Sequence, residues 1–456
     1  MDHQETLYQW RDEIKHHLKG LSKPQARELA LWSIGMVLAR KSSLTAVAIA
    51  LTLWLQKSRN TLRQCLREWY WPAKNKRGEK RVSVDPQQHF VDLAAWVLKL
   101  LPGNQIALAM DASTNKDKLT VLCVSVLISG SAIPIAWRIL PGNQPEHWKP
   151  HWLDLLDRVA DAFGPEHDVI VLADRGMWAP WLYQAIADRG WHPIMRTKGT
   201  GALGHEPLFQ ERGAPWRRLN WFTPKRGDQR CAVGRAFKKQ SLPCRLIVFF
   251  GEDAQEPWYL LVDQAIDDGR LYGLRFWIEH QFKLMKSGGW DWEKSRITDC
   301  DRASRMWLAY AVSLLWVQSF GSDAEAQDLF DERPPLTSSA DRPASSACVA
   351  NMDECNIEDR GNIEDRGNIE VNAETEPCAL TLPCPSSCAA DNQTVNHKLT
   401  DDGEAIGTWG HAHRMISLFL KGLAVVTDRL YRGASLQCPM FATSIGPGKI
   451  TSPDTS

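Results

Sequence analysis

The stretch 105-QIALAMDAST-114 decides the fold class of this chain. It is a continuous apolar run that ends in one carboxylate, Asp111. A second run of the same kind, 167-HDVIVLADRG-176, ends in Asp174. Continuous apolar runs are typical of central strands that are covered on both faces. The two stretches therefore predict an α/β core in which each of two central strands ends in an aspartate.

The segments around these two runs predict the order three strands, helix, strand, helix, strand. The further strands are expected at 118–129, 132–142 and 191–199, and the helices at 147–164 and 179–190. In an open α/β sheet, side chains at the carboxyl ends of the strands line the functional crevice. If the two central strands are adjacent and parallel, Asp111 and Asp174 lie side by side in that crevice.

Two neighbouring carboxylates repel each other, and a divalent cation is the usual remedy. Mg²⁺ prefers a few carboxylates together with waters and substrate phosphate. A pair of such ions can activate an attacking oxygen and stabilise a leaving one in phosphodiester chemistry. The structural alternative is that either aspartate only caps a turn or the following helix.

A third carboxylate stands in the stretch 272-YGLRFWIEHQFKLMK-286. At about 100° per residue, Tyr272, Arg275, Glu279 and Lys286 fall within roughly 60° of one helix face. That face would present a phenol, a guanidinium, a carboxylate and an ammonium group together. Glu279 would complete the metal ligands if this helix crosses the sheet edge. The alternative is an ordinary surface helix, on which Arg and Glu four positions apart form a weak pair.

The formal net charge of zero hides a strong asymmetry along the chain. Residues 1–100 hold 17 basic and 9 acidic residues, a net charge of +8, and residues 196–239 hold 11 and 3, again +8. Residues 321–405 hold 5 and 19, a net charge of −14. Two basic regions and one acidic region indicate a polyanion-binding body with an acidic appendage.

Residues 1–100 are predicted to form a helical DNA-binding domain. Arg59, Arg63 and Arg67 are spaced to lie on one face of the second of two short helices, which is the pattern of a helix-turn-helix. The basic run 74-KNKRGEKR-81 follows directly. The alternative is a helical bundle whose arginine stripe faces solvent.

The other regions complete the predicted organisation. Residues 101–320 form the catalytic core, interrupted by a basic, β-rich insertion at 200–262 in which Arg217 and Arg218 are candidate phosphate contacts. Residues 321–402 lack apolar periodicity and repeat a six-residue unit in tandem, so we expect an acidic, disordered segment. Residues 403–456 are expected to form a C-terminal helix and tail.

The motifs together resemble those of the DDE transposases of bacterial insertion sequences. Tyr272, Arg275, Glu279 and Lys286 match the signature Y-x2-R-x3-E-x6-K of one large group. The stretches MDAST around Asp111 and LADRG around Asp174 resemble the group's other two motifs. The resemblance covers about residues 104–320.

This resemblance implies a ribonuclease H-like catalytic core with a β-strand insertion before the glutamate. It further implies cleavage and joining of transposon ends by Asp111, Asp174 and Glu279 with Mg²⁺, for which Mn²⁺ can substitute. Arg175, Tyr272, Arg275 and Lys286 would contact DNA, and Arg275 and Lys286 suit phosphate oxygens. The expected partners are double-stranded DNA, as inverted repeats and as target, and a second copy of the chain on that DNA.

Three alternatives remain open on the sequence alone. The first is an inactive or repurposed DNA-binding protein of the same fold, and the second is a metal-dependent nuclease that does not join strands. The third is a helix-turn-helix regulator fused to an unrelated α/β domain. No signal peptide or membrane-spanning run is visible, and the 11 cysteines include no CxxC pair. We therefore expect a cytoplasmic bacterial protein that is associated with the nucleoid when bound to DNA.

Overall fold

The computed structural model describes residues 3–76, 82–142, 148–199, 207–327, 329 and 418–442. Most of the predicted acidic segment, the tandem repeat included, lies outside the described residues, and so does the end of the basic run 74–81. The first residues of that acidic segment differ from the prediction, because the last core helix continues to Ala326. The described residues all belong to one unit of the chain.

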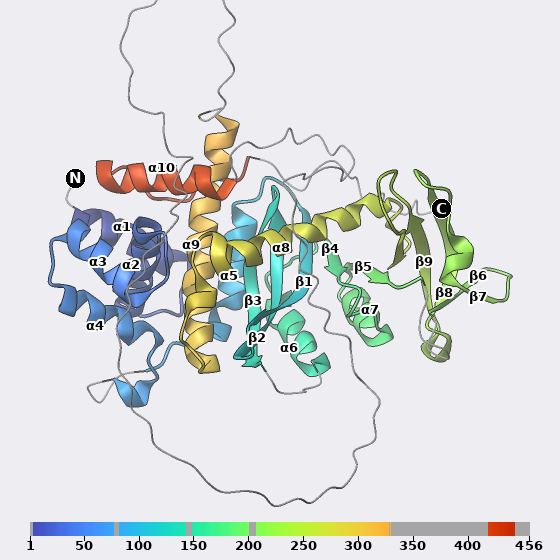
Figure 1. Ribbon diagram of the computed structural model, residues 1–456, viewed down its shortest axis with the longest axis horizontal. Coiled ribbons are helices and arrows are strands. Elements are labelled where there is room, and N and C mark those ends of the chain that lie inside the picture. The colour runs from blue at the N-terminus through green and yellow to red at the C-terminus, as the bar shows by residue number, and fades with distance from the viewer. Residues whose placement is uncertain are drawn as a thin grey trace, which may run out of the picture. The chain divides into compact units, whose positions relative to one another are not determined.

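Helices form the N-terminal part of this unit (Figure 1). They are α1 His3–His17, α2 Lys23–Ala39, α3 Leu44–Leu55, α4 Arg59–Tyr70 and α5 Phe90–Lys99. Ser22 caps α2 in a capping box with Gln25, and Ser43 caps α3 by accepting the N–H of Ala46. These hydroxyl caps explain why the predicted helices begin where they do.

The N-terminal helices share their hydrophobic core with a long helix, α9 Cys300–Ala326. The indole of Trp10 stacks on that of Trp316 with ring centroids 4.4 Å apart. The Nε1 of Trp69 donates to the backbone oxygen of Arg305 at 2.9 Å. Residues 1–100 therefore contribute side chains to a core that they do not complete by themselves.

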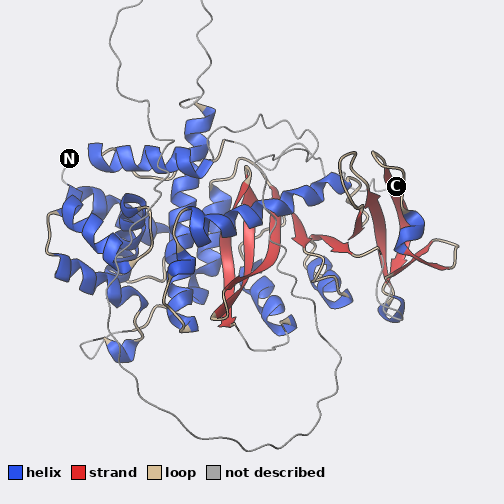
Figure 2. Ribbon diagram, viewed as in Figure 1, coloured by secondary structure: helices blue, strands red, loops and turns tan. Residues whose placement is uncertain are grey.

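A ten-stranded sheet runs through the rest of the unit in the order β3-β2-β1-β4-β5-β10-β9-β8-β6-β7 (Figure 2). The first five strands are β1 Gln105–Asn115, β2 Leu119–Ile128, β3 Ser131–Pro141, β4 Asp168–Ala173 and β5 His192–Thr197. β1, β2 and β3 are antiparallel neighbours, whereas β4 and β5 run parallel to β1. This is the ribonuclease H-like arrangement that the resemblance implies.

The strands of the predicted insertion extend the same sheet. They are β6 Leu208–Glu211, β7 Trp216–Arg218, β8 Gln229–Ala236, β9 Leu242–Phe249 and β10 Trp258–Val262. β10 pairs antiparallel with β5, with Tyr259 opposite Thr197, so the insertion is hydrogen-bonded directly to the core. A strand ladder therefore connects the insertion to the strands that carry the predicted aspartates.

The remaining helices pack against this sheet and against each other. They are α6 Lys149–Ala160, α7 Pro180–Ala187, α8 Phe276–Lys283 and α10 Leu418–Arg432. Figure 1 shows α8 running across the sheet in front of the central strands. α10 lies within the region where a C-terminal helix was predicted, and it crosses α9 closely because Gly321 and Gly422 lack side chains. A Cβ on Gly422 would lie 1.7 Å from the backbone oxygen of Val317.

No single helix within the described ranges is both long and apolar enough to cross a membrane. Only α2 and α3 taken together reach the required length and composition, and the chain bends by 91° between them.

Candidate active site

The pairing of β1 with β4 brings the two predicted aspartates to one level of the sheet. The strands are parallel and Met110 lies opposite Ala173, so Asp111 and Asp174 follow side by side. This confirms that the two strands are adjacent and parallel. The end of the first strand differs from the prediction, because β1 stays paired with β2 as far as Asn115. Asp111 therefore projects from a strand that is still held on one side, and Asp174 from the start of a loop.

The segment 272–286 is not one regular α-helix. It passes from a 3₁₀ helix, Gly269–Arg275, through α8 into a π-helical turn, Leu284–Gly288. A 3₁₀ helix advances about 120° per residue, so Tyr272 and Arg275 still lie on one face, and Arg275 contacts Glu279 on the following α-helix. Tyr272 and Arg275 point inward, with 0% and 6% of their surface exposed, whereas Lys286 is half-buried in the π turn.

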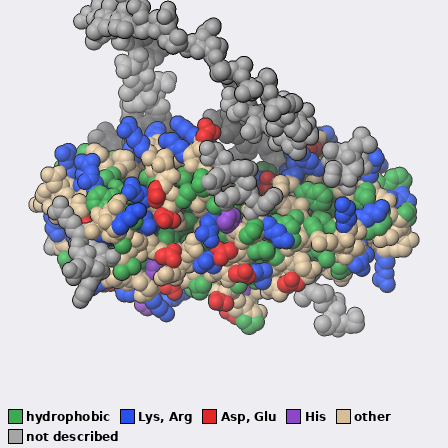
Figure 3. All heavy atoms as spheres, turned by 90° about the horizontal axis from the view of Figure 1, so that it is seen from below, with side chains coloured by type: hydrophobic (Ala, Val, Ile, Leu, Met, Phe, Trp, Pro, Cys, Tyr) green, Lys and Arg blue, Asp and Glu red, His purple; other side chains and the backbone are tan. Residues whose placement is uncertain are grey.

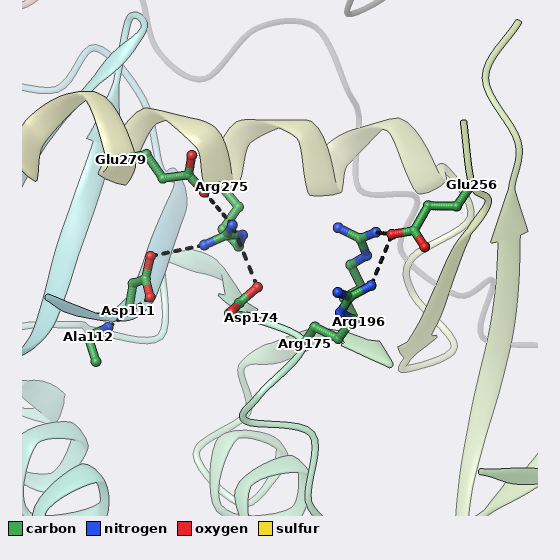
Figure 4. A network of polar contacts seen from close by, with 8 residues as sticks. All are labelled: Asp111, Ala112, Asp174, Arg175, Arg196, Glu256, Arg275 and Glu279. Carbon is green, nitrogen blue, oxygen red and sulfur yellow. Dashed lines mark hydrogen bonds and ion pairs between the residues drawn. The ribbon is translucent and has the colours of Figure 1, made fainter. Parts of the chain in front are cut away.

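Arg275 lies between the three predicted carboxylates, as Figure 4 shows. Its Nη1 donates to Oδ2 of Asp111 at 3.0 Å, and its Nη2 donates to Oε1 of Glu279 at 2.5 Å. The same Nη2 lies 3.6 Å from Oδ1 of Asp174. Carboxylates from β1, from the end of β4 and from α8 thus converge on one guanidinium group.

Negative charge is in excess at this point, because one guanidinium faces three carboxylates. Burial raises the pKa of Asp111 to about 6, and the neighbouring Asp174 and Glu279 act in the same direction. Arg275 and the N–H of Ala112, which donates to Oδ1 at 2.8 Å, work against this rise. The excess of carboxylates makes the cluster attractive to a further cation.

Tyr272 lies directly behind this cluster. Its ring packs edge-on against Trp258, with centroids 5.3 Å apart, and burial raises its pKa above the usual value. Among the described residues its hydroxyl has no hydrogen-bond partner. A buried hydroxyl without a partner is costly, so a ligand oxygen at this position would be stabilised.

The three carboxylates fit a divalent cation by their chemistry, since Mg²⁺ takes hard oxygen ligands. All three contact the guanidinium of Arg275, through Nη1 or Nη2. In this arrangement the guanidinium lies between them. Within the described ranges, no three Asp, Glu, His or Cys side chains are spaced to hold a metal ion together. Arg275 would therefore have to release a carboxylate before an ion could bind.

The other residues predicted to contact DNA lie in two further places. Arg175 donates from Nη1 to Oε1 of Glu256 at 2.9 Å, beside the acidic cluster. In the insertion, the guanidinium of Arg217 lies 4.1 Å from the ring centroid of Trp221, which is 60% exposed. Arg218 is also exposed on the same short strand, β7.

The arginine stripe of α4 is only partly open to solvent. Arg59 is exposed and Arg63 is half-buried, and the guanidinium of Arg67 lies 5.7 Å from the ring of Trp71. On the face shown in Figure 3, Lys and Arg side chains gather over the N-terminal helices and over the insertion, and acidic side chains lie mainly between them. This distribution agrees with the two basic regions of the sequence.

Sequence analysis did not single out Arg196 or Glu256. Arg196 stands near the end of β5, and its Nη2 donates to Oε1 of Glu256 at 2.6 Å. The one sequence feature that could have indicated Arg196 is its position near the end of β5, the strand next to β4, which Asp174 follows. Its partner comes from a loop 60 residues later, which no spacing rule would have connected.

The comparisons with known proteins give a family match for part of the chain. Residues 115–316 match the protein family described as "Transposase DDE domain". No curated protein matches the chain. A solved structure described as "Cryo-EM structure of piggyBac transposase synaptic complex with hairpin DNA" is similar, with 10% identity and a TM-score of 0.34. The similarity covers 73% of this chain and 82% of that one.

In this fold a ribonuclease H-like sheet and a helix that crosses it bring three carboxylates together: Asp111 from β1, Asp174 after β4 and Glu279 from α8. Residues 115–316 match a transposase DDE domain, and this match supports a DDE transposase as the class of protein. The matched range includes Asp174 and Glu279 and begins four residues after Asp111. The four-residue signature that begins at Tyr272 stays a prediction.

Proposed function

We propose that this protein cuts DNA at the ends of a transposable element and joins the freed ends to target DNA. Asp111, Asp174 and Glu279 are its catalytic residues. The observation that carries the proposal is their convergence on one buried guanidinium from three separate elements. Ordinary surface ion pairs contribute little and rarely need three anions around one cation. Such a cluster at the ends of parallel strands suits phosphodiester chemistry.

The cofactor in this proposal is Mg²⁺, with Mn²⁺ as a substitute, and the three carboxylates would hold it. When bound, it supplies activation of the attacking oxygen and stabilisation of the leaving oxygen of the phosphodiester. The chain itself holds the carboxylates in place: the β1–β4 ladder fixes the first two, and the packing of α8 on the sheet fixes the third.

Arg275 has a second role in this proposal. When it releases a carboxylate, its planar fork can turn to two phosphate oxygens of the DNA, and Lys286 can add a point charge. A phosphate oxygen could also accept a hydrogen bond from the hydroxyl of Tyr272. These contacts would position the DNA rather than read its sequence.

DNA contacts outside the active site would come from Arg59, Arg63 and Arg67 and from the insertion. Arginines that neutralise phosphates release counterions, so binding should weaken as salt rises. Two ends have to be brought together for joining, so we propose a homodimer on DNA.

Two alternatives use the same fold. A catalytically inactive DNA-binding protein would bind the element's ends without cutting them. A metal-dependent nuclease would cut but would form no joined product. The three intact carboxylates favour activity over the first alternative, and no observation separates cutting from joining.

The test uses the purified full chain and a linear DNA that carries the sequences flanking its reading frame, with and without Mg²⁺. Replacing Asp174 with asparagine should abolish cleavage while leaving DNA binding largely intact. The matched control is Asp161→Asn, an exposed aspartate after α6. Cleavage at the unchanged rate by the Asp174→Asn protein would refute the catalytic assignment. Cleavage without insertion into a second DNA would favour the nuclease.

A further inference from the structure

A polar cleft of about 270 Å³ lies beside the acidic cluster. Its walls come from the loop after β4, from the end of β5 and from the start of β10. The lining side chains that matter here are Arg175, Arg196, Lys198, Glu256 and Tyr259. Three of these five carry a positive charge and one carries a negative charge, so the cleft has a net positive charge.

One oxygen atom marks the point on which the cleft converges. Oε1 of Glu256 accepts from Nη1 of Arg175 at 2.9 Å and from Nη2 of Arg196 at 2.6 Å (Figure 4). Two guanidinium groups that donate to one anionic oxygen form the kind of contact that holds phosphate. The carboxylate of Glu256 thus stands where an oxygen of a bound phosphate would stand.

The cation and the anion in this contact differ in how firmly they are held. The side chain of Arg196 is only 14% exposed, and its guanidinium lies 5.9 Å from the ring centroid of Trp258. The side chain of Glu256 is 60% exposed. Among the described residues, the Nε of Arg196 has no hydrogen-bond partner. Arg196 is therefore held in place and its Nε–H is not used by another described residue, whereas the carboxylate of Glu256 can move out into water.

Gly199 and Tyr259, which also line the cleft, pack tightly against each other. Gly199 lies against the ring of Tyr259, and a Cβ at this glycine would stand 2.3 Å from the ring. The hydroxyls of Tyr259 and Thr223 lie 2.7 Å apart, within hydrogen-bond distance. Any larger residue than glycine would push the tyrosine out of its position.

We infer that this cleft binds one phosphate group of the DNA backbone, next to the phosphate that is cut, and that Glu256 fills its place until DNA displaces it. The location follows from the sheet: Arg175 adjoins Asp174, and Arg196 stands on β5, the neighbour of β4. The inference rests on the proposed function, because it takes DNA as the source of the phosphate.

The two sides of the contact predict changes of opposite sign. Replacing Arg196 with glutamine removes one phosphate contact, so DNA affinity should fall roughly tenfold and the salt slope should decrease by about 0.9. Replacing Glu256 with glutamine removes the competing carboxylate, so affinity should rise several-fold. A purely structural ion-pair network would instead lose stability in both variants, and neither variant would bind DNA more tightly.

The experiment measures binding of the full chain to a fluorescently labelled duplex of the flanking DNA at several salt concentrations, without divalent metal. Arg432→Gln and Asp428→Asn are the matched controls, because both residues are exposed on α10 and lie outside the cleft and the insertion. Thermal unfolding checks that each variant is folded. If Arg196→Gln does not fold, Arg196→Lys keeps the charge without the fork and should still weaken binding.

Weaker or unchanged binding by the Glu256→Gln protein would overturn the inference. Inorganic phosphate then tests the cleft independently of DNA: it should raise the unfolding temperature of Glu256→Gln more than that of the unchanged protein. No difference in this phosphate response would also count against the cleft. If the proposed function is wrong, the protein will not cleave DNA with Mg²⁺, although its Arg196 and Glu256 variants still change DNA affinity as predicted.

Discussion

Asp111 and Arg275 stand 164 positions apart in the sequence and form an ion pair of 3.0 Å. The pair joins the central strand β1 to the short 3₁₀ helix that precedes α8. Because Arg275 also reaches Asp174 and Glu279, the protein supplies its own cation to the acidic cluster. Under the proposed function, Arg275 would have to release a carboxylate before a metal ion could bind there.

Replacing Arg275 with glutamine should therefore have two effects. The metal-free protein should lose roughly 2–3 kcal/mol of stability, less than for a fully buried pair because Asp174 and Glu279 are partly exposed. Mg²⁺ should then raise the unfolding temperature more in this variant than in the unchanged protein. Calorimetry with and without Mg²⁺ measures both quantities.

The control for this experiment is Arg270→Gln, since Arg270 pairs with Asp268 on the same 3₁₀ helix and its side chain is 61% exposed. It should change neither the stability nor the response to Mg²⁺ by a comparable amount. An Arg275→Gln protein with unaltered stability would show that the three carboxylates do not depend on this guanidinium.

His192 should make stability depend on pH near neutrality. Its Nδ1 lies 2.5 Å from Asp263 and its Nε2 lies 3.1 Å from Asp168. The hydrogen bond to Asp263 is the main cause that raises the pKa of His192 above 6.5, against an opposing effect of burial. Because the pKa of His192 is higher in the folded than in the unfolded protein, its protonation stabilises the fold. This stabilisation is complete below about pH 6.5 and is lost as pH rises through the pKa of the folded state.

The measurement compares unfolding temperatures between pH 5.5 and 8.5 for the unchanged protein and for His192→Asn. The unfolding temperature of the unchanged protein should exceed that of the variant at pH 5.5, and this difference should shrink as pH rises to 8.5. A difference that is independent of pH would mean that His192 contributes by packing alone.

The arginine stripe of α4 is best tested in the full chain, because Trp10 and Trp69 bury themselves against α9. Replacing Arg59, Arg63 and Arg67 together with glutamine should weaken DNA binding and lower the salt slope by roughly 2–3. The control Arg432→Gln removes one exposed arginine of α10. If the triple variant kept the full salt slope, the insertion would have to supply most phosphate contacts.

Trp221 should act after the first cut. It is exposed and carries Arg217 on its ring, whereas the neighbouring Phe222 is buried. An aromatic face that stacks an unpaired base stabilises it by roughly 1–3 kcal/mol. Trp221→Ala should therefore leave stability and nicking unchanged and impair the later joining step. Product analysis on a pre-nicked DNA separates the two steps, and equal slowing of both would make Trp221 a general DNA clamp.

Much of the fold and the three carboxylates could be predicted from the sequence. Apolar runs mark central strands regardless of their partners, and an aspartate at the end of such a run is expected near the carboxyl end of its strand. Asp174 follows β4 directly, whereas β1 continues past Asp111 to Asn115. The parallel pairing of β1 with β4 then places Asp111 beside Asp174, as expected. The interval from Tyr272 to Lys286 predicted Glu279 as the third acidic residue, and Glu279 shares Arg275 with the two aspartates.

The details of that helix could not be predicted, because its hydrogen bonding changes from 3₁₀ to α to π within 20 residues. The pattern predicted an exposed polar face, whereas the actual backbone buries Tyr272 and Arg275 while Arg275 still contacts Glu279. The contact of Arg196 with Glu256 could not be predicted from the sequence either. It depends on how β10 pairs with β5, and sequence spacing carries no information about that pairing.

The pairing of β10 with β5 has a consequence for solubility. With the insertion in place, β5 is an inner strand that has a neighbour on each side. Without residues 208–262, its outer backbone N–H and C=O groups would face solvent, on a strand that includes the buried Ile194 and Met195. Such an edge recruits strands from other chains. A shortened protein should therefore aggregate even in the absence of DNA, so the insertion protects the sheet as well as extending it.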